Sequence, residues 1–249
     1  MNGILIIGYG VVGKNLAAEI AKLNPDVYDK YKTEHNIKKA GKYEVGFICV
    51  DTPLIDGQCN VDAVEDALFE NDCEVYVIKS TIPVGTVDSL KFQTGKKIIF
   101  SPEYYGGTQH CNNFEFAFTI LGGDKECCLM IQQKLQEVYD ARHRFFIVDS
   151  KTAEMAKFME NAWLATKVSF CCEFFRAAMK AGVDYEILRE LFVADTRVNP
   201  SHTFVYREHP WYDSHCLNKD VPSIANQFDM ELMKHVIHVN EKYKNNVNT

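Results

Sequence analysis

The chain has 249 residues, of which 47% are hydrophobic, so it is long and apolar enough for one large or two modest globular domains and is not typical of a disordered protein. Its formal net charge is -7 and its lysines and arginines form no stripe, which argues against nucleic acid or an anionic membrane as the main partner. The start, MNGILIIGYG, lacks a basic leader, and no apolar run is long enough to cross a bilayer, so we expect a cytoplasmic protein without a membrane partner.

Short β-rich apolar runs alternate with helical patterns through the first part of the chain. The runs are GILIIGYG, VYDKY, EVGFICV, EVYVIKS, KIIFSPE, FTILGG and RFFIVDS, and VVGKNLAAEIAKLN is the first helical pattern between them. This alternation is typical of βαβ units. We therefore predict an α/β fold in which residues 1–149 form a Rossmann-like domain, with a mostly parallel sheet and helices on its faces.

One long helical pattern follows from Thr152 to Ala181, with Asp149 or Ser150 as a possible N-cap and Gly182 as a C-cap signal. Because the pattern is apolar over much of its circumference, we expect the helix to pair with a second copy in a homodimer, across residues 152–181.

The remaining sequence predicts further helices and one irregular stretch. YEILRELFVA and FDMELMKHVIHVNEKY read as helices, and residues 199–220 between them are rich in proline, histidine and aromatic residues, which indicates irregular structure. We predict that residues 150–249 form an all-α domain for substrate binding and dimerisation.

The cysteines and histidines do not form a metal or disulfide pattern. The nine cysteines are an odd number without a Cys-x-x-Cys pair, which fits a reducing compartment. Neither His209, His215 and Cys216 nor His235 and His238 has the ligand number or spacing of a zinc cluster, so we expect no metal.

The stretch GYGVVG has the Gly-x-Gly-x-x-Gly pattern between a predicted strand and a predicted helix, the setting that a dinucleotide turn requires. Gly8 permits the turn, Gly10 lets the backbone approach a pyrophosphate, and Gly13 lets helix and strand pack closely. Asp29 follows the second strand, where a carboxylate would bind the adenosine ribose diol and repel a 2′-phosphate, so we predict NAD as cofactor. The expected contact residues here are Gly8, Tyr9, Gly10, Val11, Val12, Gly13 and Asp29.

Six stretches, in order, resemble the UDP-glucose/GDP-mannose dehydrogenase family, and specifically its UDP-glucose 6-dehydrogenase type. They are CVDTP, STIPVGT, SPEYY, AEMAKFMENAWLA, DTRVNPSHT and CLNKD. The resemblance implies an NAD-dependent oxidation of a nucleotide-sugar C6 alcohol to a carboxylate in two steps, with UDP-glucose to UDP-glucuronate as the expected reaction. It also implies a short form without the family's C-terminal nucleotide-binding domain.

The resemblance assigns the chemistry of the second oxidation to Cys216. A thiolate adding to the aldehyde gives a tetrahedral thiohemiacetal, whose loss of hydride leaves a thioester for water to hydrolyse. Lys157 and Asn161 match positions that contact the reacting oxygen, and their spacing of four places them on one helix face. Asp220 matches the aspartate that holds the lysine or a water.

The resemblance assigns supporting roles to several residues of the first domain. Glu103 matches the base implicated in hydrolysis, Thr81 is its hydrogen-bonding neighbour, and the loop with Thr52 and Pro53 touches the cofactor, as Thr81 does too. The implied substrate contacts are Glu103, Tyr104, Tyr105, Lys157, Asn161 and Arg197.

The sequence around Cys216 departs from the family pattern. Asp213 and Ser214 replace glycines, and Asn218 replaces a proline. If Asp213 lies close to Cys216, its charge would raise the pKa of the thiol and reduce the thiolate fraction. Two other functions therefore stay open: a dehydrogenase of the β-hydroxyacid type, which needs no cysteine, and a non-catalytic NAD-binding scaffold.

Overall fold

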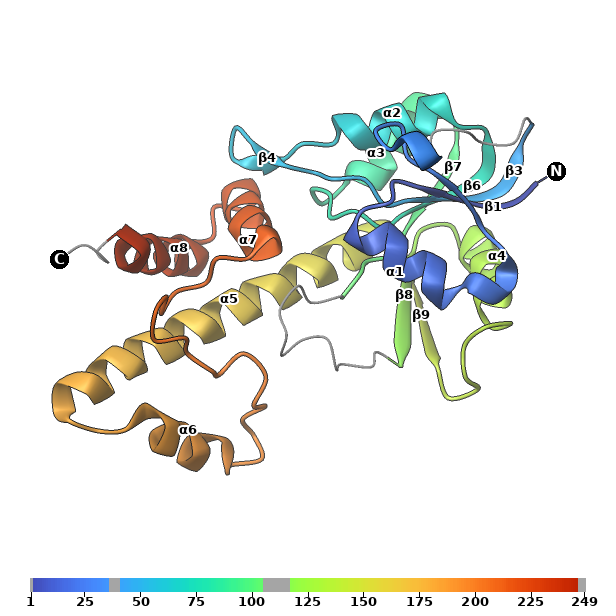
Figure 1. Cartoon of the computed structure of the whole chain (residues 1–249). Helices are drawn as coiled ribbons and strands as arrows, with labels where there is room; N and C mark the ends of the chain where they lie inside the picture. Colours follow the sequence, from blue (N-terminus) through green and yellow to red (C-terminus); the bar gives the residue numbers. More distant parts are fainter. Residues whose placement is uncertain (1, 36–40, 105–116, 246–249) are drawn as a thin grey trace. The chain divides into compact units, whose positions relative to one another are not determined.

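The computed structural model describes residues 2–35, 41–104 and 117–245, and the chain folds into two compact units (Figure 1). The first unit consists of Met1–Ile55 and Cys59–Lys157, and the second of Asp56–Gln58 and Phe158–Thr249. The predicted α/β fold is confirmed, because a sheet dominates the first unit and helices dominate the second.

The first unit contains a seven-stranded sheet in the order β2-β1-β3-β6-β7-β8-β9. Every neighbouring pair is parallel except β7 and β8, so the prediction of a mostly parallel sheet is confirmed. Its strands are β1 (Asn2–Ile7), β2 (Asp26–Tyr28), β3 (Tyr43–Ile48), β6 (Cys73–Ile78), β7 (Lys97–Phe100), β8 (Phe118–Gly122) and β9 (Arg144–Val148). A separate two-stranded ribbon joins β4 (Leu54–Ile55) and β5 (Gln58–Cys59).

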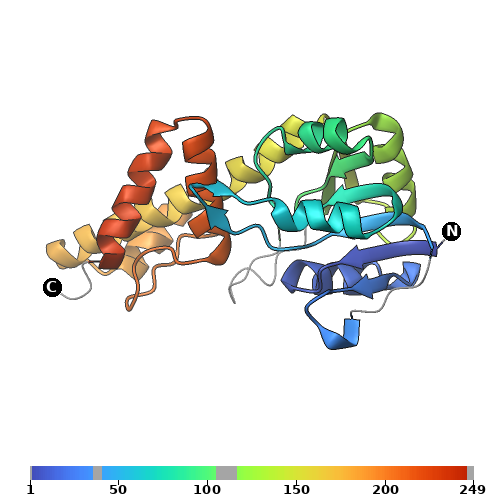
Figure 2. The ribbon, with the colours of Figure 1, turned by 90° about the horizontal axis from the view of Figure 1, so that it is seen from above.

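Helices cover both faces of this sheet (Figure 2). On one face α1 (Val11–Glu19) and α4 (Lys125–Leu135) enclose a core that includes Leu16, Phe47 and Ile131. On the other face α2 (Asp62–Glu70) and α3 (Thr86–Thr94) enclose a core that includes Leu68 and Tyr76. The central strands are buried on both sides, which explains their nearly continuous apolar runs.

The second unit contains the rest of α5 (Ser150–Ala181), followed by α6 (Tyr185–Val193), α7 (His215–Gln227) and α8 (Glu231–Asn245). Ala165 of α5, Val221 of α7 and Val236 of α8 belong to one apolar core, and Phe175 of α5 and Tyr185 of α6 belong to another. The prediction of an all-α second part is confirmed, but the stretch expected to be irregular up to residue 220 is helical from His215 onward.

Local capping sets both ends of α5. The Asp149 carboxylate accepts hydrogen bonds from the backbone N–H of Thr152 at 2.9 Å and from its hydroxyl at 2.6 Å. At the other end Gly182 has a φ of 69°, its N–H donates to Met179 and the N–H of Val183 donates to Ala178. These two hydrogen bonds form a Schellman motif, which requires the left-handed conformation that glycine adopts most easily.

Candidate cofactor and catalytic sites

The glycine turn joins β1 to α1 as the sequence predicts. Gly8 has a φ of 91°, and a Cβ atom there would lie 2.6 Å from the carbonyl oxygen of Cys49. A Cβ atom on Gly13 would lie 2.0 Å from the carbonyl oxygen of Gly8, whereas one on Gly10 would have no protein atom within 4 Å. Gly8 and Gly13 are therefore required by packing, while Gly10 leaves open space beside the start of α1.

The N-terminus of α1 has the properties of an anion site. Gly10 caps the helix without a side-chain hydrogen bond, and its first turn contains no acidic residue. The unpaired N–H groups and the dipole of a helix N-terminus favour a phosphate. This arrangement fits the pyrophosphate of a dinucleotide.

Asp29 lies beside this turn, directly after β2. Its carboxylate accepts hydrogen bonds from the backbone N–H of Tyr9 at 2.8 Å and of Tyr31 at 3.0 Å, and Lys32 lies 3.6 Å away. Burial acts to raise the pKa of Asp29, but the two N–H donors and Lys32 together hold that pKa below its ordinary value. The carboxylate therefore stays ionised, as binding of a ribose diol requires.

The carboxyl ends of neighbouring parallel strands bring further predicted residues to one edge of the sheet. Thr52 follows β3 and is buried, and its hydroxyl donates to the carbonyl oxygen of Thr81 at 2.8 Å. Thr81 follows β6, the next strand in the sheet. Ligands of open α/β sheets bind at this edge. Pro53, the next residue after Thr52, is exposed.

A buried group of charges lies at the same edge, where Glu103 follows β7. The Glu103 carboxylate forms an ion pair with Lys79, whose Nζ also donates to the Ser101 hydroxyl at 3.1 Å. Burial raises the pKa of Glu103, and the positive charges of Lys79 and Lys157 oppose that rise. Lys157 is itself buried, and its Nζ lies 4.8 Å from the centre of the Tyr104 ring.

The second unit contains another buried polar group, which includes two predicted residues. Asp220 is 1% exposed, and its carboxylate accepts from Asn161 Nδ2 at 2.5 Å and from Lys219 Nζ at 2.6 Å. Asn161 lies one turn after Lys157 on α5, as predicted. The structure thus links Asp220 to the amide of this helix, and adds Lys219 as a partner that the sequence did not predict.

Cys216 lies in the first turn of α7 and is exposed. Ser214 caps this helix, since its hydroxyl accepts from the Leu217 N–H at 3.0 Å. The departures from the family pattern contact each other, because Asp213 accepts from Asn218 Nδ2 at 2.7 Å and pairs with Lys244 at 2.9 Å. Lys244 and Asn218 hold the pKa of Asp213 below its usual value. The carboxylate of Asp213 is thus matched by a cation.

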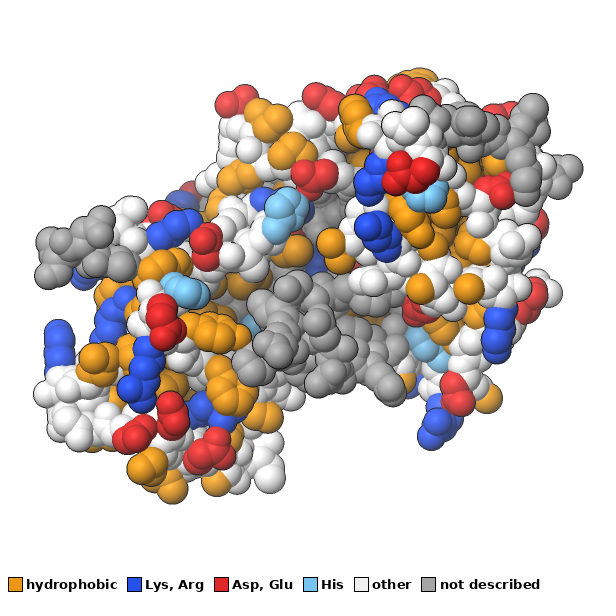
Figure 3. Space-filling view, in the orientation of Figure 1, with side chains coloured by type: hydrophobic (Ala, Val, Ile, Leu, Met, Phe, Trp, Pro, Cys, Tyr) orange, Lys and Arg blue, Asp and Glu red, His pale blue; other side chains and the backbone are white. Residues whose placement is uncertain are grey.

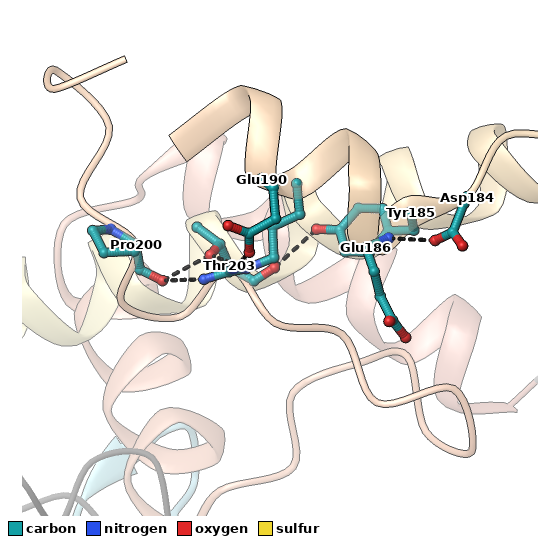
Figure 4. A network of polar contacts seen from close by, with 7 residues as sticks. Asp184, Tyr185, Glu186, Glu190, Pro200 and Thr203 are labelled. Carbon is teal, nitrogen blue, oxygen red and sulfur yellow. Dashed lines mark hydrogen bonds and ion pairs between the residues drawn. The ribbon is translucent and has the colours of Figure 1, made fainter. Parts of the chain in front are cut away.

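Arg197 lies in the loop between α6 and α7, where it is exposed and pairs with Asp195. The same loop is anchored further on by Thr203, which is fully buried. Tyr185 donates to the Thr203 carbonyl oxygen at 2.9 Å, and the Thr203 hydroxyl donates to the Pro200 carbonyl oxygen at 2.7 Å (Figure 4). The buried Arg189 Nε donates to the same hydroxyl at 2.8 Å.

Most predicted site residues thus fall into two groups, one in each unit. Tyr105 lies outside the described residues. Lys79 and Lys219 were not predicted from the sequence, although Lys79 carries a signal: it is a charge at the end of a strongly apolar run, EVYVIKS, directly before a Ser-Thr pair. Lys219 carries no comparable signal, because its burial depends on how α7 packs.

The described residues contain neither a membrane-spanning helix nor a group of metal ligands. Over residues 2–35, 41–104 and 117–245, no helix has the length and low charge needed to span a membrane. In the same ranges no group of three or more His, Cys, Asp or Glu side chains is placed to hold a metal ion. No disulfide joins the described cysteines, and among them only Cys216 is exposed.

Two family models match the chain. Residues 26–143 match the NAD binding domain of the UDP-glucose/GDP-mannose dehydrogenase family, and residues 151–242 match its central domain. The family's NAD binding domain binds the cofactor that the glycine turn and Asp29 predict, so the prediction of NAD is confirmed.

Similar proteins differ in the sugar that they are named for. The chain is 28% identical over 224 residues to UDP-glucose 6-dehydrogenase YwqF of Bacillus subtilis, covering 82% of this chain and 50% of that protein. It is 28% identical over 195 residues to UDP-N-acetyl-D-mannosamine dehydrogenase of Methanocaldococcus jannaschii, covering 73% of this chain and 44% of that protein. The chain therefore spans about half the length of these curated relatives.

The solved structures support the same fold. A UDP-glucose dehydrogenase from Pyrobaculum islandicum superposes with a TM-score of 0.80 at 22% identity, over 97% of this chain and 68% of that one. With the fold shared and both domain models matched in order, the chain belongs to the UDP-glucose/GDP-mannose dehydrogenase family.

Proposed function

We propose that this protein is an NAD-dependent dehydrogenase that oxidises the C6 alcohol of a nucleotide sugar to a carboxylate, with UDP-glucose as the preferred substrate. The observation that carries the proposal is that one compact unit contains the glycine turn beside Asp29 and the buried Glu103 and Lys157, and that residues 26–143 of this unit match the family's NAD binding domain. The SPEYY stretch supports UDP-glucose, because it is one of the six stretches that resemble the UDP-glucose 6-dehydrogenase type.

The chemistry is divided between the cofactor and the chain. Bound NAD would supply the two-electron oxidant, one molecule for each of the two oxidations. The turn at Gly10 and the N-terminus of α1 would hold its pyrophosphate, and Asp29 would hold the adenosine ribose. The described residues fit this role, because a Cβ atom on Gly10 would meet open space and the start of α1 carries no acidic residue.

Cys216 is the proposed nucleophile. The first oxidation turns the alcohol into an aldehyde, and the thiolate then forms a C–S bond to the aldehyde carbon. Loss of a second hydride gives a thioester, and water cleaves its C–S bond to release the carboxylate and restore the thiol. The position of Cys216 in the first turn of α7 supports this role, because helix N-termini stabilise negative charge and the residue is exposed.

The other polar groups are proposed to position the substrate. The Lys157 ammonium and the Asn161 amide, one turn apart on α5, would bind the reacting oxygen as negative charge develops on it. Asp220 orients Asn161 through their hydrogen bond. Glu103 would take the proton of the hydrolytic water, with Thr81 nearby. Tyr104, Tyr105 and Arg197 are proposed substrate contacts.

The test is the ratio of NADH formed to sugar consumed. The purified protein is incubated with NAD and, separately, with UDP-glucose, UDP-galactose, GDP-mannose and UDP-N-acetyl hexosamines. We expect two NADH for each UDP-glucose consumed. The absence of NADH with every nucleotide hexose would contradict the proposed function.

The Cys216→Ser variant tests the covalent step separately. We expect it to lose the four-electron oxidation, while wild-type Cys216 is alkylated by iodoacetamide ahead of the buried thiols. A variant that keeps full multi-turnover activity would favour a β-hydroxyacid-type dehydrogenase instead. NAD binding by calorimetry, together with an unreactive Cys216 and no turnover, would indicate a non-catalytic scaffold.

We also propose that the protein is a homodimer through α5 and is located in the cytoplasm. Phe170 and Phe174 of α5 and Phe192 of α6 form an aromatic cluster, with the ring of Phe170 4.7 Å from Phe174 and 6.1 Å from Phe192. All three side chains are exposed, and apolar side chains show among charged ones on the surface in Figure 3. An exposed apolar cluster of this kind is typical of an interface. Light scattering of the wild type and of Phe170→Glu tests the dimer.

A further inference from the structure

Lys79 forms a buried ion pair with Glu103, and the proposed mechanism gives a role to Glu103 but none to Lys79. The Lys79 residue is 7% exposed, and the Glu103 side chain is 14% exposed. Lys79 follows β6 and Glu103 follows β7, so two adjacent parallel strands place them at one edge of the sheet. A charge at such a position is costly to bury unless it is paired.

We propose that Lys79 is a positioning residue, whose ammonium, held by Ser101, favours the ionised form of the Glu103 carboxyl and fixes it in one orientation at the carboxyl edge of the sheet. This inference rests on the proposed function, in which Glu103 takes the proton of the hydrolytic water. A carboxyl group can accept that proton only while it is ionised.

The other groups around Glu103 determine how strongly its ionisation depends on Lys79. Burial disfavours the ionised form, and it is the largest influence on this carboxyl. Titratable groups from several elements interact electrostatically with Glu103. They are Lys79 after β6, Cys49 after β3, Glu19 of α1, Tyr139 after α4 and Lys157 of α5. Burial raises the pKa of both Cys49 and Tyr139, so these two groups stay neutral.

The remaining charges are therefore two ammonium groups and the carboxylate of Glu19, which disfavours a second negative charge. Lys157 acts on Glu103 less strongly than Lys79, which forms the ion pair. The Ser101 hydroxyl fixes Lys79 from the other side at 3.1 Å. Lys79 is thus the principal group that offsets the burial of Glu103.

The experiment measures the titration of Glu103 directly, without using turnover. The full chain is labelled with glutamate carrying ¹³C in its carboxyl group, and Glu103→Gln assigns the resonance. In Lys79→Met we expect the titration midpoint of Glu103 to rise by about 1 to 3 pH units, the usual effect of losing an adjacent opposite charge. In Lys79→Arg, which keeps the charge, we expect the midpoint to stay near that of the wild type.

Lys97→Met is the matched control. Lys97 lies on β7 and also pairs with a glutamate, Glu74, at 3.5 Å, but its side chain is 59% exposed. The Glu103 midpoint should not move in this variant. An unchanged midpoint in Lys79→Met would overturn the proposal. If Lys79→Met does not fold, the Glu103 titration midpoint is measured in Ser101→Ala instead. A raised midpoint supports the proposal, and an unchanged one overturns it.

A second readout separates this inference from the proposed function. If the protein makes NADH from a nucleotide sugar, the acid limb of the pH-rate profile should shift to higher pH in Lys79→Met. In Lys79→Arg it should lie at the same pH as in the wild type. A merely structural role would lower the rate equally at every pH. If the wild type makes no NADH but the Glu103 midpoint still rises in Lys79→Met, the ion pair has its proposed electrostatic role and only the proposed reaction fails.

Discussion

Replacing Thr203 with valine tests how the loop that carries Arg197 is anchored. Valine has nearly the same shape as threonine but lacks the hydroxyl. In the native protein this hydroxyl accepts from the Arg189 guanidinium at 2.8 Å and donates to the Pro200 carbonyl oxygen at 2.7 Å, and Thr203 is fully buried. Thr203→Val therefore leaves a buried donor and a buried acceptor without this partner.

The expected loss follows from these two bonds. A hydrogen bond to a charged group contributes about 1.5–3 kcal/mol and a neutral one about 0.5–1.5 kcal/mol, so Thr203→Val should destabilise the second unit by about 2–4 kcal/mol. With a urea dependence of about 2 kcal/mol per molar, the unfolding midpoint should fall by about 1–2 M.

Tryptophan fluorescence in urea is the suitable assay. The chain has two tryptophans, Trp163 and Trp211, and both belong to the second unit, so their signal reports its unfolding. The control is Thr166→Val, because the Thr166 hydroxyl is only half-buried and donates to the Ala162 carbonyl oxygen within α5. We expect the control to lie within about 0.5 kcal/mol of the wild type. A loss below about 0.5 kcal/mol in Thr203→Val would show that these two hydrogen bonds do not anchor the loop.

Three further predictions concern other charged groups. Asp220→Ala leaves the buried Lys219 without its partner carboxylate. It should destabilise the second unit by about 3–5 kcal/mol in the same urea assay, and a loss below about 1 kcal/mol would be inconsistent with a buried ion pair. Asp213→Ala breaks the exposed pair with Lys244 and should cost at most about 1 kcal/mol, a difference that should shrink in high salt; a larger, salt-independent loss would contradict this. Burial raises the pKa of Glu154 from 4.5 to about 7. Between these pH values the folded chain keeps a proton that the unfolded chain releases. The free energy of unfolding should therefore fall as the pH rises through this window. Calorimetric unfolding from pH 5 to 7 should show this slope in the wild type and not in Glu154→Gln, and parallel slopes would contradict it.

The strands and the turns of the first unit could be predicted because their signals are local. Runs such as EVYVIKS are long enough in apolar residues to identify β6, and Gly8 and Gly182 lie where backbone geometry requires a positive φ. The cap of α5 by Asp149 is local too, since the bonded residues are three apart. Such features depend on a few consecutive residues, so the sequence contains them in readable form.

The start of α7 was predicted wrongly, also for a local reason. The stretch before it is rich in proline, histidine and aromatic residues, and Pro222 lies inside the helix itself. These residues disfavour helix in isolation. The helix forms because Leu217, Val221 and Ala225 share one face and pack into the core of the second unit. Tertiary packing overrode the propensity, and it placed Cys216 in the first helical turn.

By itself the sequence determined the class of fold, the dinucleotide turn, and the residue types available for an oxidation, because periodicity, glycine positions and motif order are properties of neighbouring residues. Only the tertiary structure decided which charges meet. Glu154 accepts hydrogen bonds from the start of α3, 69 residues away at Gly85, and Lys79 reaches Glu103 across two strands. Burial and ion pairing depend on the distance between side chains in space, and that distance is set only when the sheet and its helices pack.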